Sequence, residues 1–408
     1  MSNIERNYSI AKEVYAAVGV DTDGVLKTLR ATPISVHCWQ LDDVTGFEDF
    51  NSALTGGIAA TGNAPGKPKS KDEFFKDMDR ALALIPGATK LSLHAIYLDD
   101  GGLKIGRDKI EPSHFAFWVE YAKKRGVGLD FNATYFSHPL SDSGFTLASS
   151  DKGIRDFWIE HGKRCRLVGE SFGRELGRQC VTNHWIIDGY KDFTVDKLAP
   201  RERLIASLDE LFAKPLDRDC NVDAVESKLF GLGSESYVVG SHEFYTNYVA
   251  NRKNCIICLD AGHFHPTEIV SAKISSYLAF GQEILLHVSR PVRWDSDHVV
   301  ALDDETLAIM QEIVRCGGLD RVHIGLDFFD ASINRVAALA IGSRNARKAL
   351  LAALLSPADA LKRAEADGNL TLRLALLEEC KTMPLGFVWD YFCETEGTPG
   401  SNWYEGLV

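Results

Sequence analysis

Short β-rich runs alternate with helical stretches along the chain, and this alternation constrains the fold more than any other feature. The runs are apolar, whereas the stretches between them repeat apolar residues with the period of a helix. The expected strands are Pro33–Trp39, Lys90–Leu98, Gly126–Ala133, Gln179–Ile187, Val222–Phe230, Cys255–Ala261, Glu283–Ser289 and Arg321–Phe328. Strands that alternate with helices pair in parallel, and eight of them close into a barrel. The sequence therefore predicts an α/β fold, a (β/α)8 TIM barrel.

Helical segments also flank the predicted barrel. An N-terminal helix is expected over Ile4–Val18. After the last strand, helices are expected over Arg335–Leu355, Ala358–Asp367 and Leu370–Lys381. We therefore expect residues 1–330 to form the barrel with its N-terminal helix, and residues 331–408 to form an additional C-terminal helical extension.

The composition limits the possible functions. The chain has 408 residues, of which 45% are hydrophobic and 25% charged, which is typical of a globular protein with a sizeable core. A formal net charge of −12 argues against a nucleic-acid partner, whose phosphates attract Lys and Arg. No uncharged apolar stretch is long enough to span a bilayer, and the charges within residues 1–19 argue against a signal peptide. We expect no membrane association.

The nine cysteines are scattered along the chain. Cys255 and Cys258 form a C-x-x-C within a predicted strand, where residues three apart point to opposite faces. That spacing is wrong for chelation or for a disulfide. The cysteines therefore indicate buried thiols in a reducing cytoplasm.

The longest stretch without regular patterning runs from Asp42 to Lys71. It carries Thr55-Gly-Gly57, Thr61-Gly-Asn63 and Pro65-Gly66. A glycine-rich loop can cradle phosphate, but no Lys-Ser/Thr pair follows in P-loop spacing. We interpret the stretch as a loop at the barrel mouth that could act as a lid.

Metal-binding residue types stand near the ends of most predicted strands, where a barrel of this kind places its active site. In chain order they are His37; His94; Asp130 and Asn132; Glu226 and Lys228; Asp260 and His263; His287, with Asp295 and Asp297 beyond it; and Asp327. The fourth strand offers Asn183 with Trp185, or His184 with Asp188, depending on its register. A single Asp at a strand end is usually a helix cap or a turn residue. The prediction of a metal site therefore depends on such residues occurring together at the ends of most strands.

Charged side chains inside a barrel are costly unless they pair or bind a metal. The ligand types divide into two plausible shells: Glu226, Asp260, His287 and Asp327 in one, and His263, Asp295 and Asp297 in the other. Oxygen and nitrogen ligands without thiolate favour Mn, Mg or Co. Two metals that share a site lie about 4 Å apart.

Long motifs around these residues resemble the L-rhamnose isomerase family. They are Ser35-Val-His37-Cys-Trp39-Gln40, Leu93-His94-Ala-Ile-Tyr97-Leu98, Glu226-Ser-Lys228, Asp260-Ala-Gly-His263-Phe-His265-Pro266-Thr-Glu268, His287-Val-Ser-Arg-Pro-Val-Arg-Trp-Asp295-Ser-Asp297-His298 and Gly325-Leu-Asp327-Phe-Phe-Asp330. The resemblance covers nearly the whole chain. It implies a cytoplasmic homotetramer that converts L-rhamnose to L-rhamnulose, the first step of rhamnose catabolism. It also implies two divalent cations per subunit, usually Mn²⁺, with Zn, Co or Mg left open.

The resemblance further implies roles for individual residues. The structural metal would be held by Glu226, Asp260, His287 and Asp327, and the catalytic metal by His263, Asp295 and Asp297. Lys228 would bind the sugar beside the reacting carbons, and His94 with Asp327 would help to open the ring. Two cations and an ammonium suit the negative charge that develops on O1 and O2 of an open-chain aldose. The ordinary pKa of an imidazole, near neutrality, suits His94 to a proton relay.

Two routes could move hydrogen between C1 and C2. A metal-assisted hydride shift needs no general base, whereas a cis-enediol route does. The number of expected cations favours the hydride shift, but the sequence leaves both open. The methyl group of a 6-deoxy sugar also needs apolar contacts, for which Ile96, Trp185 and Phe329 are candidates, with core packing as the alternative for each.

Three other readings stay open from the residues alone. A xylose-type isomerase or a sugar epimerase can use a similar ligand shell on the same barrel. A metal-dependent phosphodiesterase is disfavoured because the chain lacks a basic stripe interleaved with aromatics. A non-catalytic binding protein leaves Lys228 and His94 unexplained beside a full metal shell.

Overall fold

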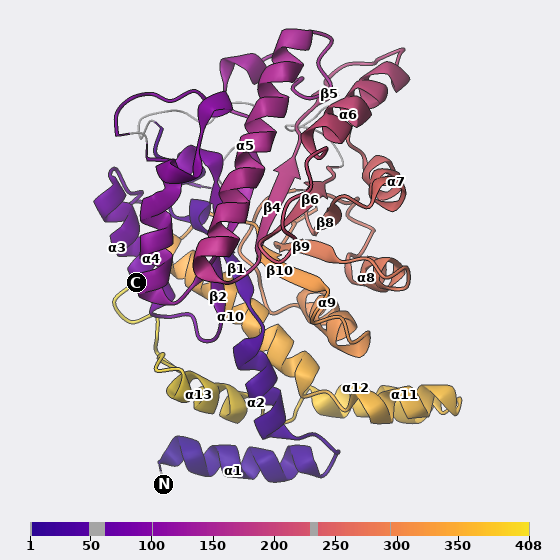
Figure 1. Ribbon diagram of the computed structural model, residues 1–408. Coiled ribbons are helices and arrows are strands. Elements are labelled where there is room, and N and C mark those ends of the chain that lie inside the picture. The colour runs from indigo at the N-terminus through magenta and orange to yellow at the C-terminus, as the bar shows by residue number, and fades with distance from the viewer. Residues whose placement is uncertain (1, 49–61, 100, 229–235, 294, 408) are drawn as a thin grey trace.

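The computed structural model describes residues 2–48, 62–99, 101–228, 236–293 and 295–407. Its parallel strands close into a barrel in the order β1-β10-β9-β8-β6-β4-β3-β2 (Figure 1). They are β1 (Ile34–His37), β2 (Thr89–His94), β3 (Gly128–Thr134), β4 (Cys180–Trp185), β6 (Asn221–Glu226), β8 (Ile256–Asp260), β9 (Ile284–Val288) and β10 (Val322–Leu326). Each strand overlaps the range predicted for it, so the (β/α)8 barrel is confirmed.

Several strands end earlier than the sequence suggests. The strand predicted over Lys90–Leu98 stops at His94, and Ala95–Tyr97 form the 3-10 helix η2. Likewise β1 gives way to η1 (Cys38–Gln40). All of these residues are buried. Apolar character therefore predicted burial correctly, but burial between the barrel and its helices does not require an extended backbone.

One helix follows each barrel strand before the next begins and packs outside the barrel (Figure 1). The helices are α3 (Lys71–Leu82), α4 (Ala116–Arg125), α5 (Lys152–Leu176), α6 (Leu198–Leu211), α7 (His242–Arg252), α8 (Ser271–Leu278), α9 (Asp304–Arg315) and α10 (Arg335–Leu354). The short strands β5 (Gly189–Tyr190) and β7 (Tyr237–Val238) pair antiparallel and form a small sheet that was not predicted. No helix among the described residues is long and apolar enough to cross a bilayer.

A layer of helices from both ends of the chain lies below the barrel in Figure 1. Its members are α1 (Asn3–Ala16), α11 (Ala358–Ala366), α12 (Leu370–Cys380) and α13 (Leu385–Thr395), and α2 (Thr22–Ala31) connects it to β1. Tyr8 of α1 stacks on Tyr391 of α13 with ring centroids 3.9 Å apart. The helices α2 and α13 were not predicted.

Helix α10 ties this layer to the barrel. Arg347 is buried, and its guanidinium donates to the carbonyl oxygens of Leu29 (3.0 Å), Thr32 (2.5 Å) and Ala88 (2.6 Å). Burial lowers the pKa of Arg347 to about 10. Because α10 covers the barrel yet lies beyond residue 330, the division into 1–330 and 331–408 stays a prediction.

The predicted mouth loop is only partly described. Residues 49–61, with Thr55-Gly-Gly57, lie outside the described residues, as do Leu229 and Phe230. The described part next to β1 is anchored by Arg335, which donates to both Asp43 oxygens at 3.1 and 2.8 Å. The interpretation as a lid therefore stays a prediction.

The barrel wall separates two apolar regions. Cys258 belongs to a small interior cluster with Val181, Val222, Ala224, Ile256 and Leu285. Cys255 packs in the larger core between strands and helices. The two cysteines thus point to opposite faces as predicted, and all nine cysteines of the chain are free thiols.

Candidate active site

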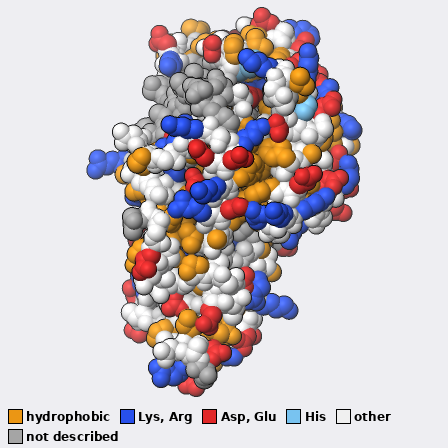
Figure 2. All heavy atoms as spheres, turned by 90° about the vertical axis from the view of Figure 1, so that its left-hand side faces the viewer, with side chains coloured by type: hydrophobic (Ala, Val, Ile, Leu, Met, Phe, Trp, Pro, Cys, Tyr) orange, Lys and Arg blue, Asp and Glu red, His pale blue; other side chains and the backbone are white. Residues whose placement is uncertain are grey.

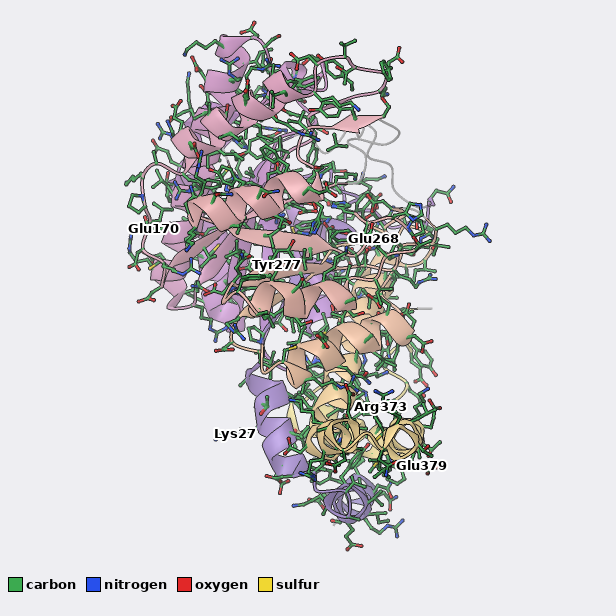
Figure 3. All side chains as sticks on the ribbon, turned by 90° about the vertical axis from the view of Figure 1, so that its right-hand side faces the viewer. Lys27, Glu170, Glu268, Tyr277, Arg373 and Glu379 are labelled. Atoms are coloured by element: carbon green, nitrogen blue, oxygen red, sulfur yellow. The ribbon has the colours of Figure 1, made fainter. Side chains whose placement is uncertain are left out.

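The predicted metal ligands converge where the barrel strands end. Glu226 is the last residue of β6 and Asp260 the last of β8, while Asp327 directly follows β10. Asp260 pairs in register with His287 of β9. In Figure 3, Glu268, on the loop after β8, and Glu170, on α5, mark opposite ends of the barrel. The cluster lies toward the end marked by Glu268.

The first cluster comprises Glu226, Asp260, His287 and Asp327, whose ligand atoms all lie within 4.8 Å of one another. His287 Nδ1 is 3.2 Å from Glu226 Oε2, 3.4 Å from Asp327 Oδ2 and 3.7 Å from Asp260 Oδ2. That nitrogen is buried and forms no hydrogen bond. Three carboxylates around an unpartnered imidazole nitrogen are what a divalent cation with oxygen and nitrogen ligands requires.

The second cluster comprises Asp260, His263 and Asp295. His263 Nε2 lies 3.3 Å from Asp295 Oδ2, and its Nδ1 lies 3.0 Å from Glu226 Oε1. Asp295 comes close because residue 262 is glycine: a Cβ there would lie 2.3 Å from Asp295 Oδ1. That Asp295 oxygen is itself buried without a hydrogen-bond partner. The two clusters share Asp260.

Asp297 lies near this cluster but is not among the three residues whose ligand atoms gather within 4.8 Å. Its backbone adopts a positive φ of 47°, which Asp tolerates better than most residues. Burial raises its pKa well above the usual range, and the charges of Asp295 and Asp327 add to the effect. Asp297 therefore lies close enough to Asp295 and Asp327 to interact with them electrostatically, but it does not belong to the group of three whose ligand atoms converge.

Protonation within the two clusters reflects crowded negative charge. Burial and the neighbouring carboxylates of Glu226 and Asp327 together raise the pKa of Asp260 to about 7, although the charge of His263 opposes the shift. Burial opposes charge on His263, but Asp260 and Asp295 outweigh it and hold the pKa of His263 well above its ordinary value. So many buried carboxylates are stable together only with compensating cations. The residues present therefore fit two divalent metal ions.

Lys228 reaches the second cluster from beyond the end of β6. Its Nζ donates to Asp295 Oδ2 at 2.7 Å and lies 4.8 Å above the ring of Trp185. Burial alone would lower the pKa of Lys228, but Asp295 and Asp297 outweigh burial and raise it. The side chain therefore remains an ammonium.

Burial determines the protonation state of His94. It is the last residue of β2, and its Nδ1 hydrogen-bonds Thr134 Oγ1 at 3.1 Å. Burial lowers the pKa of His94 to about 4, although Asp327 and Glu226 oppose the shift. The imidazole is thus neutral at pH 7, because the ring is removed from water.

The fourth strand adopts the first of its two possible registers. Asn183 donates to Glu226 Oε2 at 2.5 Å, and Trp185 lies beneath the Lys228 ammonium. His184 instead bonds Tyr135 at 2.9 Å on the outer face of the barrel wall. The alternative of His184 with Asp188 is therefore wrong, because strand alternation sends only one of the two sets inward.

Two other residues near the site were not predicted to act in it. Trp39 Nε1 donates to Asp327 Oδ1 at 2.9 Å. Phe136 lies between His94 and Trp185, with ring centroids 5.4 and 5.5 Å away. Trp39 could have been found, because it belongs to one of the motifs that resemble the family. Phe136 could not, because it follows a strand and no local sequence feature distinguishes it.

Other candidates take part in packing. His37 binds the backbone of Phe328 through Nε2, and Asp130 pairs with Lys90 Nζ at 2.5 Å. Ile96 is buried against Gly46, where a Cβ would lie 2.7 Å from Ile96 Cγ1. Phe329 is partly buried against the main core. Of the three apolar pocket candidates, Trp185 contacts the residues described above: its ring lies below Lys228 and stacks with His263.

Among solved structures, the chain is similar to an L-ribulose 3-epimerase, with 12% sequence identity, a TM-score of 0.49, and coverage of 78% of this chain and 95% of that chain. It is also similar to a D-allulose 3-epimerase from Methylomonas sp., with 13% identity and a TM-score of 0.46 over 79% of this chain and 96% of that chain. Sequence identities and TM-scores this low do not indicate an activity.

Sequence relatives are much closer. The model of the L-rhamnose isomerase (RhaA) family matches residues 2–407. L-rhamnose isomerases of Escherichia coli, Citrobacter koseri and Salmonella gallinarum are each 56% identical over 407 residues, covering 100% of this chain and 97% of theirs. The motifs that meet at the barrel mouth and the match over the full length lead to one conclusion: the chain belongs to the L-rhamnose isomerase family.

Proposed function

We propose that this chain interconverts L-rhamnose and L-rhamnulose, an aldose–ketose isomerisation at the mouth of the barrel and the first step of rhamnose catabolism. The observation that carries the proposal is the juxtaposition of two ligand clusters, joined by Asp260, with the Lys228 ammonium. Family membership supplies the substrate, since the relatives bear the name L-rhamnose isomerase.

Two divalent cations per subunit would occupy the clusters, with Mn²⁺ preferred and Zn²⁺, Co²⁺ or Mg²⁺ as alternatives. The first would be held by Glu226, Asp260, His287 and Asp327, and the second by His263, Asp295 and Asp297. When bound, the cations stabilise negative charge on two sugar oxygens and acidify a coordinated hydroxyl. The unpartnered His287 Nδ1 among three carboxylates supports the first assignment.

Lys228 and His94 would act on the sugar directly. The Lys228 ammonium stabilises negative charge on a sugar oxygen beside the reacting carbons. Because its pKa is raised, Lys228 stays protonated and cannot take a proton from the sugar, which favours direct hydride transfer between C1 and C2 over a cis-enediol route. Ring opening removes a proton from the C1 hydroxyl, breaks the C1–O5 bond and delivers a proton to O5. The neutral His94 imidazole can accept the first proton and supply the second. Asp327 assists His94 in this step and also holds a cation.

The sugar's methyl group would contact an apolar surface at the mouth. Trp185, Ile96 and Phe329 remain the candidates from sequence, and Trp185 is supported by its place beneath Lys228. Phe136 joins them because its ring lies between His94 and Trp185.

The test is isomerisation of L-rhamnose by chelator-stripped protein, before and after addition of Mn²⁺. Ketose that forms only with Mn²⁺ supports both the reaction and the metal centre. Bound Mn²⁺ with no ketose from L-rhamnose contradicts the substrate assignment, and a panel of other aldoses would then identify the substrate.

We also propose a homotetramer in the cytoplasm that binds neither nucleic acid nor membrane. No residue of α12 is buried, and Leu370 and Leu374, which lie four residues apart on one face of the helix, leave 53 and 58% of their surface exposed. An apolar helix face of this kind suits contact with a second copy of the chain. Free thiols are consistent with a reducing compartment, and acidic and basic side chains intermingle on the face shown in Figure 2. Light scattering would measure the assembly, and Leu374→Glu should reduce it.

A further inference from the structure

A buried thiol adjoins the first metal cluster. Cys258 pairs in register with Glu226 across β6 and β8, and the side chain of each points into the barrel. A ligand atom from each of Glu226, Cys258 and His287 lies within 4.8 Å of the other two. All three side chains are buried.

We propose that Glu226, Cys258 and His287 form an alternative site for thiophilic divalent cations, of which Cd²⁺ is the probe. The inference rests on the proposed metal centre, because Glu226 and His287 would also hold the hard cation there. The unpartnered Nδ1 of His287, whose side chain is only 5% exposed, is a second indication of a ligand in this region.

The chemistry follows from ligand softness. Thiolate selects soft cations, whereas the carboxylate-rich cluster suits harder ones. Binding breaks the S–H bond of Cys258 and forms a metal–sulfur bond, and the released proton passes to solvent. The interior neighbours of Cys258, such as Ala224, Ile256 and Leu285, are apolar and offer no competing oxygen ligands.

The two cation types exclude one another. Glu226 and His287 belong to both ligand groups, so they cannot bind two cations at once, one beside Cys258 and the other between Asp260 and Asp327. A soft cation therefore displaces the hard cation from the first cluster and inhibits the enzyme. Cys258 thus confers sensitivity to thiophilic metals on a site otherwise built from oxygen and nitrogen.

The direct test is the thiolate-to-cadmium charge-transfer absorption of chelator-stripped protein titrated with one equivalent of Cd²⁺. We expect the band in the wild type and in Cys255→Ser, a control at the residue before β8 that packs in the core outside the barrel, and its loss in Cys258→Ser. X-ray absorption at the cadmium edge of the wild type should show one sulfur ligand, a readout that needs no variant. Cadmium bound by oxygen and nitrogen alone would overturn the proposal.

Inhibition provides a second readout. Each protein is assayed relative to its own activity with Mn²⁺ while Cd²⁺ is added. Cys258→Ser should need at least about tenfold more Cd²⁺ for half-inhibition, since loss of even an outer-shell partner weakens metal binding about 10- to 100-fold. Equal sensitivity of Cys258→Ser and wild type rejects the proposal. A cadmium–sulfur band in a protein that makes no ketose with Mn²⁺ would uphold this inference and reject the proposed function.

Discussion

The indole nitrogen of Trp39 donates a hydrogen bond of 2.9 Å to Oδ1 of Asp327. Trp39 follows β1 and Asp327 follows β10, and these two strands are neighbours in the barrel. The bond leaves Asp327 Oδ2 facing His287 Nδ1 at 3.4 Å. The ring of Trp39 also packs edge-on against His94, with centroids 4.5 Å apart. One aromatic side chain thus orients a proposed metal ligand and packs against the residue proposed to open the sugar ring.

Trp39→Phe should weaken Mn²⁺ binding about 10- to 100-fold, because outer-shell hydrogen bonds of this kind orient the ligand. Calorimetric titration of the stripped protein measures the affinity. Trp403→Phe, in the C-terminal segment, is the control. Unchanged affinity in Trp39→Phe would show that Asp327 is oriented by other contacts.

Asp327→Asn should lose both metal occupancy and turnover. The substitution keeps the shape of the side chain but removes the negative charge that balances the cation. Metal content by elemental analysis and isomerase rate are measured together, with the exposed Asp320→Asn as control. Near-normal activity would overturn the assignment of Asp327, at the end of β10, as a metal ligand.

Gly262→Ala should displace Asp295, since the new Cβ would lie 2.3 Å from Asp295 Oδ1. We expect lower affinity at one of the two metal sites and an activity loss of tenfold or more, on the order of the effect of an outer-shell change. Gly386→Ala, where a Cβ meets nothing within 4 Å, is the matched control. A fully active Gly262→Ala enzyme would mean that Asp295 need not stay in place.

Lys228→Met should lower kcat by about 10²- to 10³-fold, the usual effect of removing a group that stabilises charge in the transition state. Lys228→Arg should recover little, because a planar guanidinium does not replace the compact ammonium. Steady-state kinetics of both variants are compared with the exposed Lys191→Met. If only KM rises while kcat is kept, Lys228 binds the sugar without assisting the reaction.

Acid should destabilise the protein partly through His161, which lies on α5 and belongs to neither ligand cluster. Burial lowers the pKa of His161 to about 3 from an unfolded value of 6.5. The unfolded state therefore binds more protons between these values, and stability present above pH 6.5 is lost as the pH falls toward 3. The loss from this residue is about 2 kcal/mol between pH 7 and pH 5. Urea unfolding at both pH values should show a smaller loss in His161→Gln, and no such difference for the exposed His265→Gln.

Much of the fold could be predicted from local patterns. Each of the eight runs contains a strand, because apolar β-rich runs bounded by turns and helices have few other solutions. The strand ends were less predictable: Ala95–Tyr97 remain buried while leaving the extended conformation. The helix α13 escaped prediction because its pattern follows directly on a proline and a short turn.

The site could be predicted as a set of residues but not as a geometry. Glu226, Asp260, His287 and Asp327 were assigned to one shell from their strand positions, and the structure brings their ligand atoms within 4.8 Å. Asp297 was placed in the second shell by its motif, yet its turn carries it outside the tight group. The role of Cys258 was missed, because thiols on a predicted strand are usually buried without function.

The sequence by itself determined the alternation of strands and helices, the residues that end the strands and the family, since these depend on periodicity and on long motifs in one chain. The tertiary structure alone decided the register of β4, the neutral state of His94 and the bond from Trp39 to Asp327. Each depends on atoms from strands far apart in the chain and on how deeply they are withdrawn from water. Local patterns do not record such distances or burial; only the closed barrel creates them.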